Sequence, residues 1–125
     1  MQELTVLVVE DEASIRLSLV YDLQDAGFRV VEARDADEAM SMIASRTDIE
    51  AVVTDIGMPG SVDGMGLAHW MRDHVPNIPI IIATAFSGLA DLDAVNPAIV
   101  RVIIKPYSTD AIVECLNLVR LDGKA

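Results

Sequence analysis

Acidic side chains stand together where an apolar run ends near the start of the chain. The stretch LTVLVVEDEAS, residues 4–14, is apolar but for one threonine over its first six residues and then places Glu10, Asp11 and Glu12 in succession. Each carboxylate raises the cost of ionising its neighbours. A bound cation would relieve that repulsion, so this cluster is a candidate cation site. The dipole of a helix N-terminus also favours acids, and we assign that role to Glu12.

Three more residues that can do chemistry follow later apolar runs. Asp55 lies in VVTDIGMPG, Thr84 in IIIATAF, and Lys105 precedes a proline in IIKPY. A set of oxygen ligands without cysteine or paired histidine indicates a hard ion such as Mg²⁺, which prefers to bridge a carboxylate and a phosphate. Asp55 is then a candidate nucleophile, because aspartate can form an acyl phosphate. Lys105 could pair with phosphoryl oxygens, and Thr84 could donate a hydrogen bond to one of them.

The elements that would hold these residues form a regular alternation. Five apolar runs rich in β-branched residues predict strands over Leu4–Val9, Phe28–Ala33, Ala51–Ile56, Ile78–Thr84 and Ile99–Ile104. The first, third, fourth and fifth are nearly all apolar, which is typical of strands covered on both faces. Helical patterns between them predict a parallel sheet with helices on both faces. Ligands bind such sheets beyond the carboxyl ends of the strands, where Glu10, Asp55 and Lys105 all stand.

The helices are predicted from apolar stripes and from their end signals. The stripes comprise Ile15, Leu19, Leu23 and Ala26; Ala36, Ala39, Met40 and Ile43; Leu67, Ala68, Met71 and Val75; and Ile112, Val113, Leu116 and Val119. Gly27 is the expected cap at the end of the first helix. Asp35 and Glu38 have the spacing of a capping box. A short, weakly patterned helix is expected between Ser87 and Val95, ended by Pro97.

Composition narrows the class of protein. The chain has 125 residues, of which 52% are apolar, so we expect one globular domain over residues 1–125. A net charge of −11 disfavours nucleic acid and anionic lipid as direct partners. There is no apolar stretch near the roughly 20 residues that span a membrane and no leader pattern, so we expect a soluble cytoplasmic protein. Cys115 is expected to be an inert buried thiol, His69 and His74 surface residues, and Trp70 partial cover for the core.

Along essentially its whole length the sequence resembles the CheY-like receiver domain of bacterial two-component response regulators. Five motifs carry the resemblance, in order: VLVVEDE, DADEAM, VVTDIGMPG, TA and KPY. The resemblance implies a flavodoxin-like, doubly wound (βα)5 fold. Its five parallel strands would follow the order 2-1-3-4-5, with helices on both faces. It also implies a switch in protein–protein interactions rather than an enzyme, with only Mg²⁺-assisted self-phosphorylation and dephosphorylation.

The resemblance assigns roles to individual residues. Asp55 would accept a phosphoryl group from a phosphohistidine on a sensor histidine kinase or a histidine phosphotransfer protein. Mg²⁺, or Mn²⁺ in its place, would be bound by Asp11, Asp55 and the backbone carbonyl of Gly57, with Glu10 acting through water. The phosphoryl group would meet Thr84, Ala85, Lys105 and Pro106, with a cis peptide before the proline. The downstream effector would be another protein, and the domain itself a monomer or weak dimer.

Several positions depart from the family pattern. Glu10 stands where aspartate is more usual, and PGSVDG is one residue longer than its counterpart. Val102 replaces the Tyr or Phe that acts as a switch in many members. The stretch from Thr84 to Lys105 is about one residue short, and Asn96-Pro97 replaces a turn that usually contains glycine. The site is therefore expected to be intact and the read-out face unusual.

Other functions fit the residues less well. A phosphatase of the haloacid-dehalogenase-like group needs a second aspartate two residues after the nucleophile, where this chain has Gly57. A flavodoxin-like FMN carrier needs a phosphate-binding loop after the first strand, where the three acids would repel phosphate. A receiver fold used as a docking module without phosphorylation remains the main alternative. The receiver pattern leaves no output domain, so the protein either acts through another protein or belongs to a longer chain.

Overall fold

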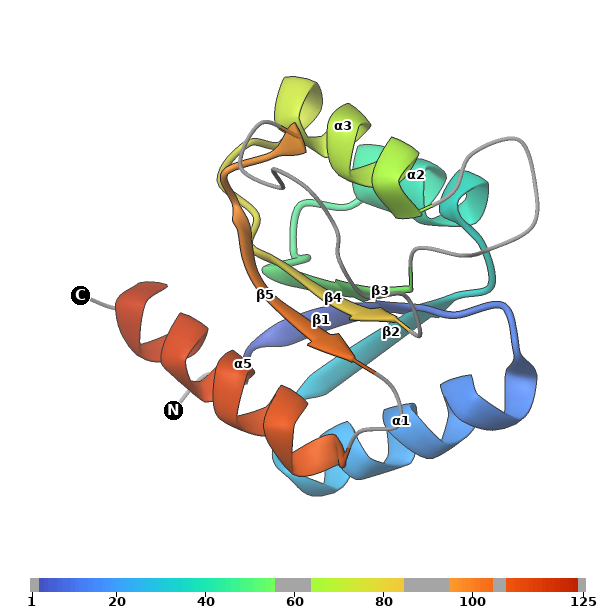
Figure 1. Cartoon of the computed structure of the whole chain (residues 1–125), viewed down its shortest axis with the longest axis vertical. Coiled ribbons are helices and arrows are strands. Elements are labelled where there is room, and N and C mark those ends of the chain that lie inside the picture. Colours follow the sequence, from blue (N-terminus) through green and yellow to red (C-terminus); the bar gives the residue numbers. More distant parts are fainter. Residues whose placement is uncertain (1–2, 56–63, 85–94, 105–107, 124–125) are drawn as a thin grey trace.

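The computed structural model describes residues 3–55, 64–84, 95–104 and 108–123, with side chains of the last helix described through residue 119. Its strands are β1 (Thr5–Val9), β2 (Arg29–Ala33), β3 (Ala51–Thr54), β4 (Ile80–Thr84) and β5 (Ile99–Ile104). They form one sheet in the order β2-β1-β3-β4-β5, and every pair is parallel (Figure 1). The predicted fold class and strand order are confirmed.

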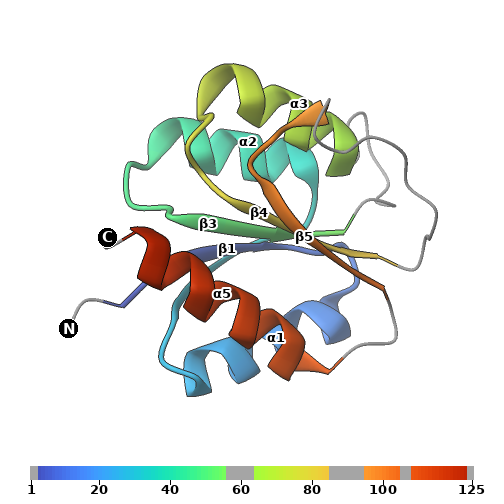
Figure 2. The same cartoon turned by 60° about the vertical axis from the view of Figure 1, so that its left-hand side comes forward.

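Helices cover both faces of this sheet. Their bounds are α1 (Ala13–Asp25), α2 (Ala36–Ser45), α3 (Gly64–His74) and α5 (Thr109–Gly123). Figures 1 and 2 show α2 and α3 together on one face and α1 and α5 on the other. The helix predicted between Ser87 and Val95 falls almost wholly outside the described residues.

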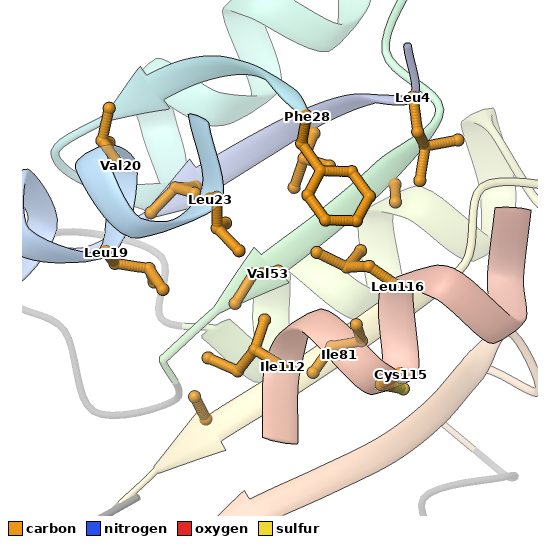
Figure 3. Close-up of a cluster of buried hydrophobic side chains, with 14 of the residues drawn as sticks. Leu4, Leu19, Val20, Leu23, Phe28, Val53, Ile81, Ile112, Cys115 and Leu116 are labelled. Carbon is orange, nitrogen blue, oxygen red and sulfur yellow. The ribbon is translucent and has the colours of Figure 1, made fainter. Parts of the chain in front are cut away.

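Alternating strand residues build a separate core under each pair of helices, because successive side chains point to opposite faces. Leu7, Val52 and Ile80 belong to the cluster beneath α2 and α3. Val53 and Ile81 belong to the cluster beneath α1 and α5, where Figure 3 shows them among side chains from both helices. Residues on both faces of β1, β3 and β4 are buried. The near-continuous apolar runs of these strands are thereby explained.

The end of α1 is fixed by its glycine, as predicted. Gly27 has φ +98°, a backbone conformation that residues other than glycine rarely adopt. Its N–H donates to the Gln24 carbonyl at 3.0 Å, and the Phe28 N–H donates to the Leu23 carbonyl at 3.1 Å. These two bonds form a Schellman motif. The buried side chains of Leu23 and Phe28 lie in one cluster, so the cap also sets the direction in which the chain enters β2 (Figure 3).

The start of α2 is capped by the predicted pair in a modified form. The Asp35 carboxylate accepts from the Glu38 N–H at 2.8 Å, which is the N-cap bond. The Glu38 carboxylate accepts from the N–H of Arg34 at 2.9 Å rather than from that of Asp35. Both side chains therefore tie the turn between β2 and α2 to the helix.

Several details of the prediction are wrong. β1 and β2 each begin one residue later than predicted, at Thr5 and Arg29. The third strand ends at Thr54 and the fourth begins at Ile80, each short of the predicted run. The last strand is not covered on both faces: β5 is an edge strand, with Val100 49% and Ile104 43% exposed. It also contains an irregularity, because Ile80 pairs with Ile99 and Ile81 with Arg101, so that Val100 is the extra residue.

Two smaller findings concern the exposure of Ala26 and the ability of the helices to span a membrane. Ala26, placed in the apolar stripe of the first helix, is exposed, because α1 already ends at Asp25. Among the described residues, no helix combines the length and the apolar character needed to cross a bilayer.

Candidate functional site

The carboxyl edge of the sheet brings the predicted acids onto neighbouring strands. Val9 and Thr54 are paired across β1 and β3, so Glu10 and Asp55 follow side by side at the sheet edge. The Asp55 N–H donates to the Val9 carbonyl at 3.3 Å, which extends the strand pairing to the first residue past β3. The Thr54 hydroxyl donates to the Asp55 carbonyl at 2.9 Å. The backbone of Asp55 is thus held on both sides.

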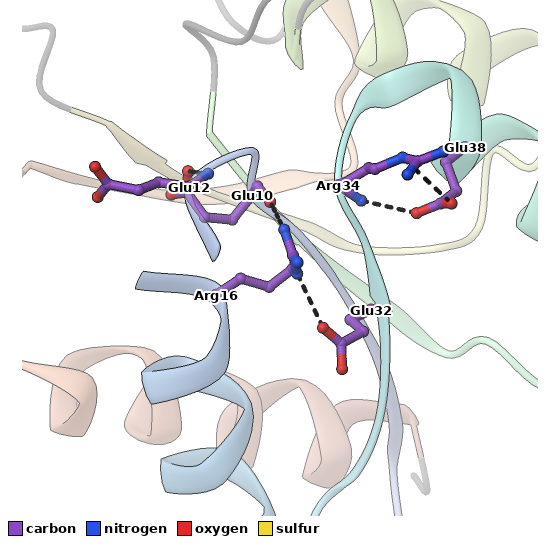
Figure 4. Close-up of polar contacts among 6 residues, drawn as sticks. All are labelled: Glu10, Glu12, Arg16, Glu32, Arg34 and Glu38. Carbon is purple, nitrogen blue, oxygen red and sulfur yellow. Dashed lines mark hydrogen bonds and ion pairs between the residues drawn. The ribbon is translucent and has the colours of Figure 1, made fainter. Parts of the chain in front are cut away.

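Glu10 is buried, with only 5% of its surface exposed, although it is an acid. Its N–H donates to the Ala33 carbonyl on β2 at 3.1 Å. Its carboxylate Oε2 accepts from the Glu12 N–H at 3.1 Å, and its carbonyl accepts from Arg16 Nη1 at 2.8 Å (Figure 4). A buried carboxylate is tolerated only when its oxygens are hydrogen-bonded, and the bond from the Glu12 N–H supplies part of that need.

The three predicted metal-binding carboxylates have different surroundings. Glu10 is buried, Asp55 is partly buried, and Asp11 is exposed. Glu12, placed at the N-cap of α1, makes no side-chain cap bond, so its predicted role at the helix end is limited to its charge. Within the described residues, no three His, Cys, Asp or Glu side chains are grouped closely enough to hold a metal ion by themselves. The predicted ligand set adds the carbonyl of Gly57, which lies outside those residues.

Oxygen chemistry at this edge fits a hard divalent ion. Asp11 is accessible to solvent, and it lies between Glu10 and Glu12, whose backbone groups are both hydrogen-bonded. Asp55 lies at the end of the adjacent strand. Carboxylate oxygens are the ligands that Mg²⁺ and Mn²⁺ prefer, and Mg²⁺ typically keeps several waters beside one or two of them.

Thr84 ends β4 in a fully buried position, with 0% of its surface exposed. Its strand partner on β5 is Ile104, and Ile82 is paired with Val102. Because side chains alternate, these four residues share one face of the sheet, and Val102 packs against the cluster beneath α2 and α3. Thr84 and Val102, the residue at the position of the family's switch aromatic, therefore lie on neighbouring strands, offset by two residues.

The remaining predicted site residues lie outside the described parts of the chain. They are Gly57, Ala85, Lys105 and Pro106, together with residues 59–63 of the PGSVDG stretch. The direction of the fifth strand is nevertheless fixed, since Ile104, next to Lys105, pairs with Thr84. The lysine thus follows a strand that ends at the same edge as β1 and β3.

Residues predicted to have only structural or surface roles behave as expected. Cys115 is buried, and burial raises the pKa of its thiol. His69 and His74 are exposed, and Trp70 partly covers the core beneath α2 and α3. The His74 ring also stacks on Trp70, with centroids 4.4 Å apart, a contact that the sequence pattern does not predict.

Sequence reasoning missed two residues with long-range contacts, Arg16 beside the site and Asn96 at the opposite edge of the sheet, just before β5 begins. No role is predicted for Arg16, yet it binds the carbonyl of Glu10. Asn96 is predicted only to take the place of a turn glycine, yet it is 1% exposed and its side chain donates to the Ala68 carbonyl of α3 at 3.0 Å. The available signal was a polar side chain beside an apolar run, which gives no indication of a partner far away in the chain.

Comparison with known proteins assigns this architecture. The family model of the response regulator receiver domain matches residues 6–117. A putative NtrX-like response regulator of Rickettsia conorii is 31% identical over 119 residues, which are 94% of this chain and 25% of that protein. The probable transcriptional regulator ycf27 of Porphyridium aerugineum is 38% identical over 109 residues, 86% of this chain and 44% of that protein. This chain therefore spans less than half of the length of these curated relatives.

Solved structures agree with the sequence comparisons. The response regulator TrrA of Thermotoga maritima, solved in complex with Mg²⁺–BeF, is 29% identical and has a TM-score of 0.82. The alignment covers 93% of this chain and 98% of that one. The Vibrio cholerae chemotaxis response regulator CheY4 is 26% identical, with a TM-score of 0.83 over 94% of this chain and 99% of that one. The chain belongs to the response regulator receiver domain family of two-component signalling.

Proposed function

We propose that this receiver domain is switched by phosphorylation of Asp55. The observation that carries the proposal is the place of Asp55, directly after β3 and beside the acidic end of β1. Asp55 is partly buried, so its carboxylate is near solvent while its backbone is held by Val9 and Thr54. A nucleophile fixed in this way meets the positional demand of phosphoryl transfer.

The transfer itself is a displacement at phosphorus. A carboxylate oxygen of Asp55 forms a bond to the phosphorus of a phosphohistidine, while the bond between phosphorus and the imidazole nitrogen breaks. The leaving nitrogen keeps the electron pair, and the product on this chain is an aspartyl phosphate. Thr84 would donate a hydrogen bond from its hydroxyl to one phosphoryl oxygen, and Lys105 would pair with another. Both roles are supported by the fact that β4 and β5 end at the same edge of the sheet.

A divalent cation, Mg²⁺ or Mn²⁺, fits the acids at this edge. Asp11, Asp55 and the Gly57 carbonyl would hold it, with Glu10 contacting it through water. When bound, the ion neutralises the charge that gathers on the phosphoryl oxygens. TrrA, which is 29% identical to this chain, was solved with Mg²⁺ and BeF bound. The likeness supports the same cation chemistry for this chain.

Partners follow from the family. A phosphohistidine donor would be a sensor histidine kinase or a histidine phosphotransfer protein. The net charge of −11 favours protein effectors over direct contact with nucleic acid or anionic membranes. We expect a monomer or weak dimer whose phosphorylated surface binds a downstream protein in the cytoplasm.

The test is phosphorylation by a small donor. The domain is incubated with acetyl phosphate with and without Mg²⁺, and its intact mass is measured. We expect one added phosphoryl group on the wild type with Mg²⁺, none on Asp55→Asn, and wild-type behaviour of Asp25→Asn, an exposed acid at the far end of α1. A folded wild type that stays unmodified, or an equally modified Asp55→Asn, would instead favour a docking module that works without phosphorylation.

A further inference from the structure

Arg16 connects the acidic end of β1 to β2, the outermost strand on that side of the sheet. Its guanidinium donates through Nη1 to the Glu10 carbonyl at 2.8 Å and through Nε to the Glu32 carboxylate of β2 at 2.9 Å (Figure 4). The side chain is only 17% exposed. Helical side chains lean toward the N-terminus of their helix, so an arginine in the first turns of α1 is well placed to reach back to the loop before it.

The contacts of Arg16 complete the fixation of Glu10. The Glu10 N–H is bound to β2 and its carboxylate to the Glu12 N–H, while Arg16 holds the remaining backbone group, the carbonyl. The peptide that begins with this carbonyl leads directly into Asp11. Its orientation therefore sets the direction in which the exposed Asp11 carboxylate leaves the backbone.

We propose that Arg16 is a positioning residue of the cation site, which it serves through the Glu10 carbonyl rather than by touching the ion. This inference rests on the proposed function. Glu32 contributes by holding the guanidinium in place from the other side. Arginine suits this task because its planar fork presents several donors in fixed directions, whereas lysine offers one ammonium on a flexible stem.

The direction in which the Mg²⁺ dissociation constant changes distinguishes a positioning role of Arg16 from a purely electrostatic one. Replacing Arg16 by methionine removes a positive charge and leaves the Glu32 carboxylate uncompensated. On electrostatic grounds alone, a more negative sheet edge attracts Mg²⁺ more strongly, so the dissociation constant would fall. If Arg16 acts by fixing the Glu10 peptide, the dissociation constant instead rises, because Asp11 is no longer held in the orientation that binds the ion.

The matched control is Arg34. It follows β2 near the same edge, its side chain is 74% exposed, and its contact is with Glu38 of α2 at 3.8 Å. Arg34→Met removes the same charge without touching the acidic loop. It should leave the Mg²⁺ affinity nearly unchanged or raise it slightly.

The experiment is a Mg²⁺ titration of wild type, Arg16→Met and Arg34→Met at fixed ionic strength, in which the backbone amide NMR signals report binding. We expect Arg16→Met to weaken binding by about tenfold, the low end of the usual effect of outer-shell mutations. We also expect faster hydrogen exchange at the Glu12 amide in that variant. Phosphorylation by acetyl phosphate should be slow at low Mg²⁺ and recover at saturating Mg²⁺, since Asp55 itself is unchanged.

Each outcome decides the inference. Unchanged or tighter Mg²⁺ binding by Arg16→Met, or equal weakening by both arginine variants, overturns it. If Arg16→Met does not fold, Arg16→Lys, which keeps the charge but not the fork of donors, replaces it: weaker Mg²⁺ binding supports the inference, and wild-type binding overturns it. A wild type that binds no Mg²⁺ refutes the proposed function, and the inference with it, whereas normal wild-type binding leaves the function standing whatever Arg16 does.

Discussion

Asn96 is expected to be a major stabilising side chain outside the apolar core. It is 1% exposed, donates to the Ala68 carbonyl of α3 at 3.0 Å, and accepts from the Ala98 N–H at 2.8 Å. Asn96→Ala removes both hydrogen bonds, each with a net value of about 1 kcal/mol, and leaves the partly buried Ala98 N–H without that acceptor. We predict a loss of about 2–3 kcal/mol of unfolding free energy and, for a chain of this size, a fall in Tm of roughly 10 °C.

The assay is urea unfolding of the metal-free domain followed by circular dichroism. The control is Asn77→Ala, since Asn77 is exposed and its replacement should change the unfolding free energy by less than about 0.5 kcal/mol. Asn96→Asp keeps the acceptor for Ala98 but replaces the donor to Ala68 by a carboxylate oxygen, so it should be no better than alanine. A loss below about 1 kcal/mol for Asn96→Ala would show that the turn before β5 is held by its backbone bonds alone.

Two further predictions concern the acidic edge and the signal that leaves it. Asp11→Asn should raise the Tm of the metal-free domain and weaken Mg²⁺ binding, because it removes one of the repelling carboxylates. Calorimetry with and without Mg²⁺ measures both effects. A lower Tm of the metal-free variant would mean that Asp11 is mainly a structural hydrogen-bond acceptor. Phosphorylation should change hydrogen exchange most over residues 86–97, where the sequence predicts a short and weakly anchored helix, and less at Val102, which is too small to act as an aromatic lever. Changes confined to residues 99–104 would contradict the second prediction.

The parts of the fold that follow from local pattern were predictable. Buried strands with both faces covered read as continuous apolar runs, as in β1, β3 and β4. Gly27 and Asp35 act within a few residues of their own positions, and both caps formed as expected. β5 differs from these strands in carrying a charged residue, Arg101, which is exposed, so its composition held a sign of exposure that the prediction did not use. Its exposure follows from its place at the sheet edge, which is a property of the strand order.

Two side-chain contacts, one beside the acidic end of β1 and one at the turn before β5, were not predictable, because they join distant parts of the chain. Asn96 reaches a carbonyl 28 positions earlier, and Arg16 reaches a carboxylate 16 positions later. In each case the side-chain type is compatible with a simple surface role. Only the packing of α3 beneath the turn before β5, and of β2 beside α1, supplies the partner.

The succession of three acids at the end of a buried strand also finds its physical reason in these contacts. The carboxylate of Glu10 is buried but accepts from the Glu12 N–H, and its carbonyl faces the Arg16 cation. Glu12 stands at the N-cap of α1, where the helix dipole favours a negative charge. Repulsion within the cluster is therefore offset locally for its first and third members, and Asp11 is the member left exposed to solvent. Under the proposed function, this arrangement would leave one accessible carboxylate on a held backbone for binding a small hard cation beside Asp55.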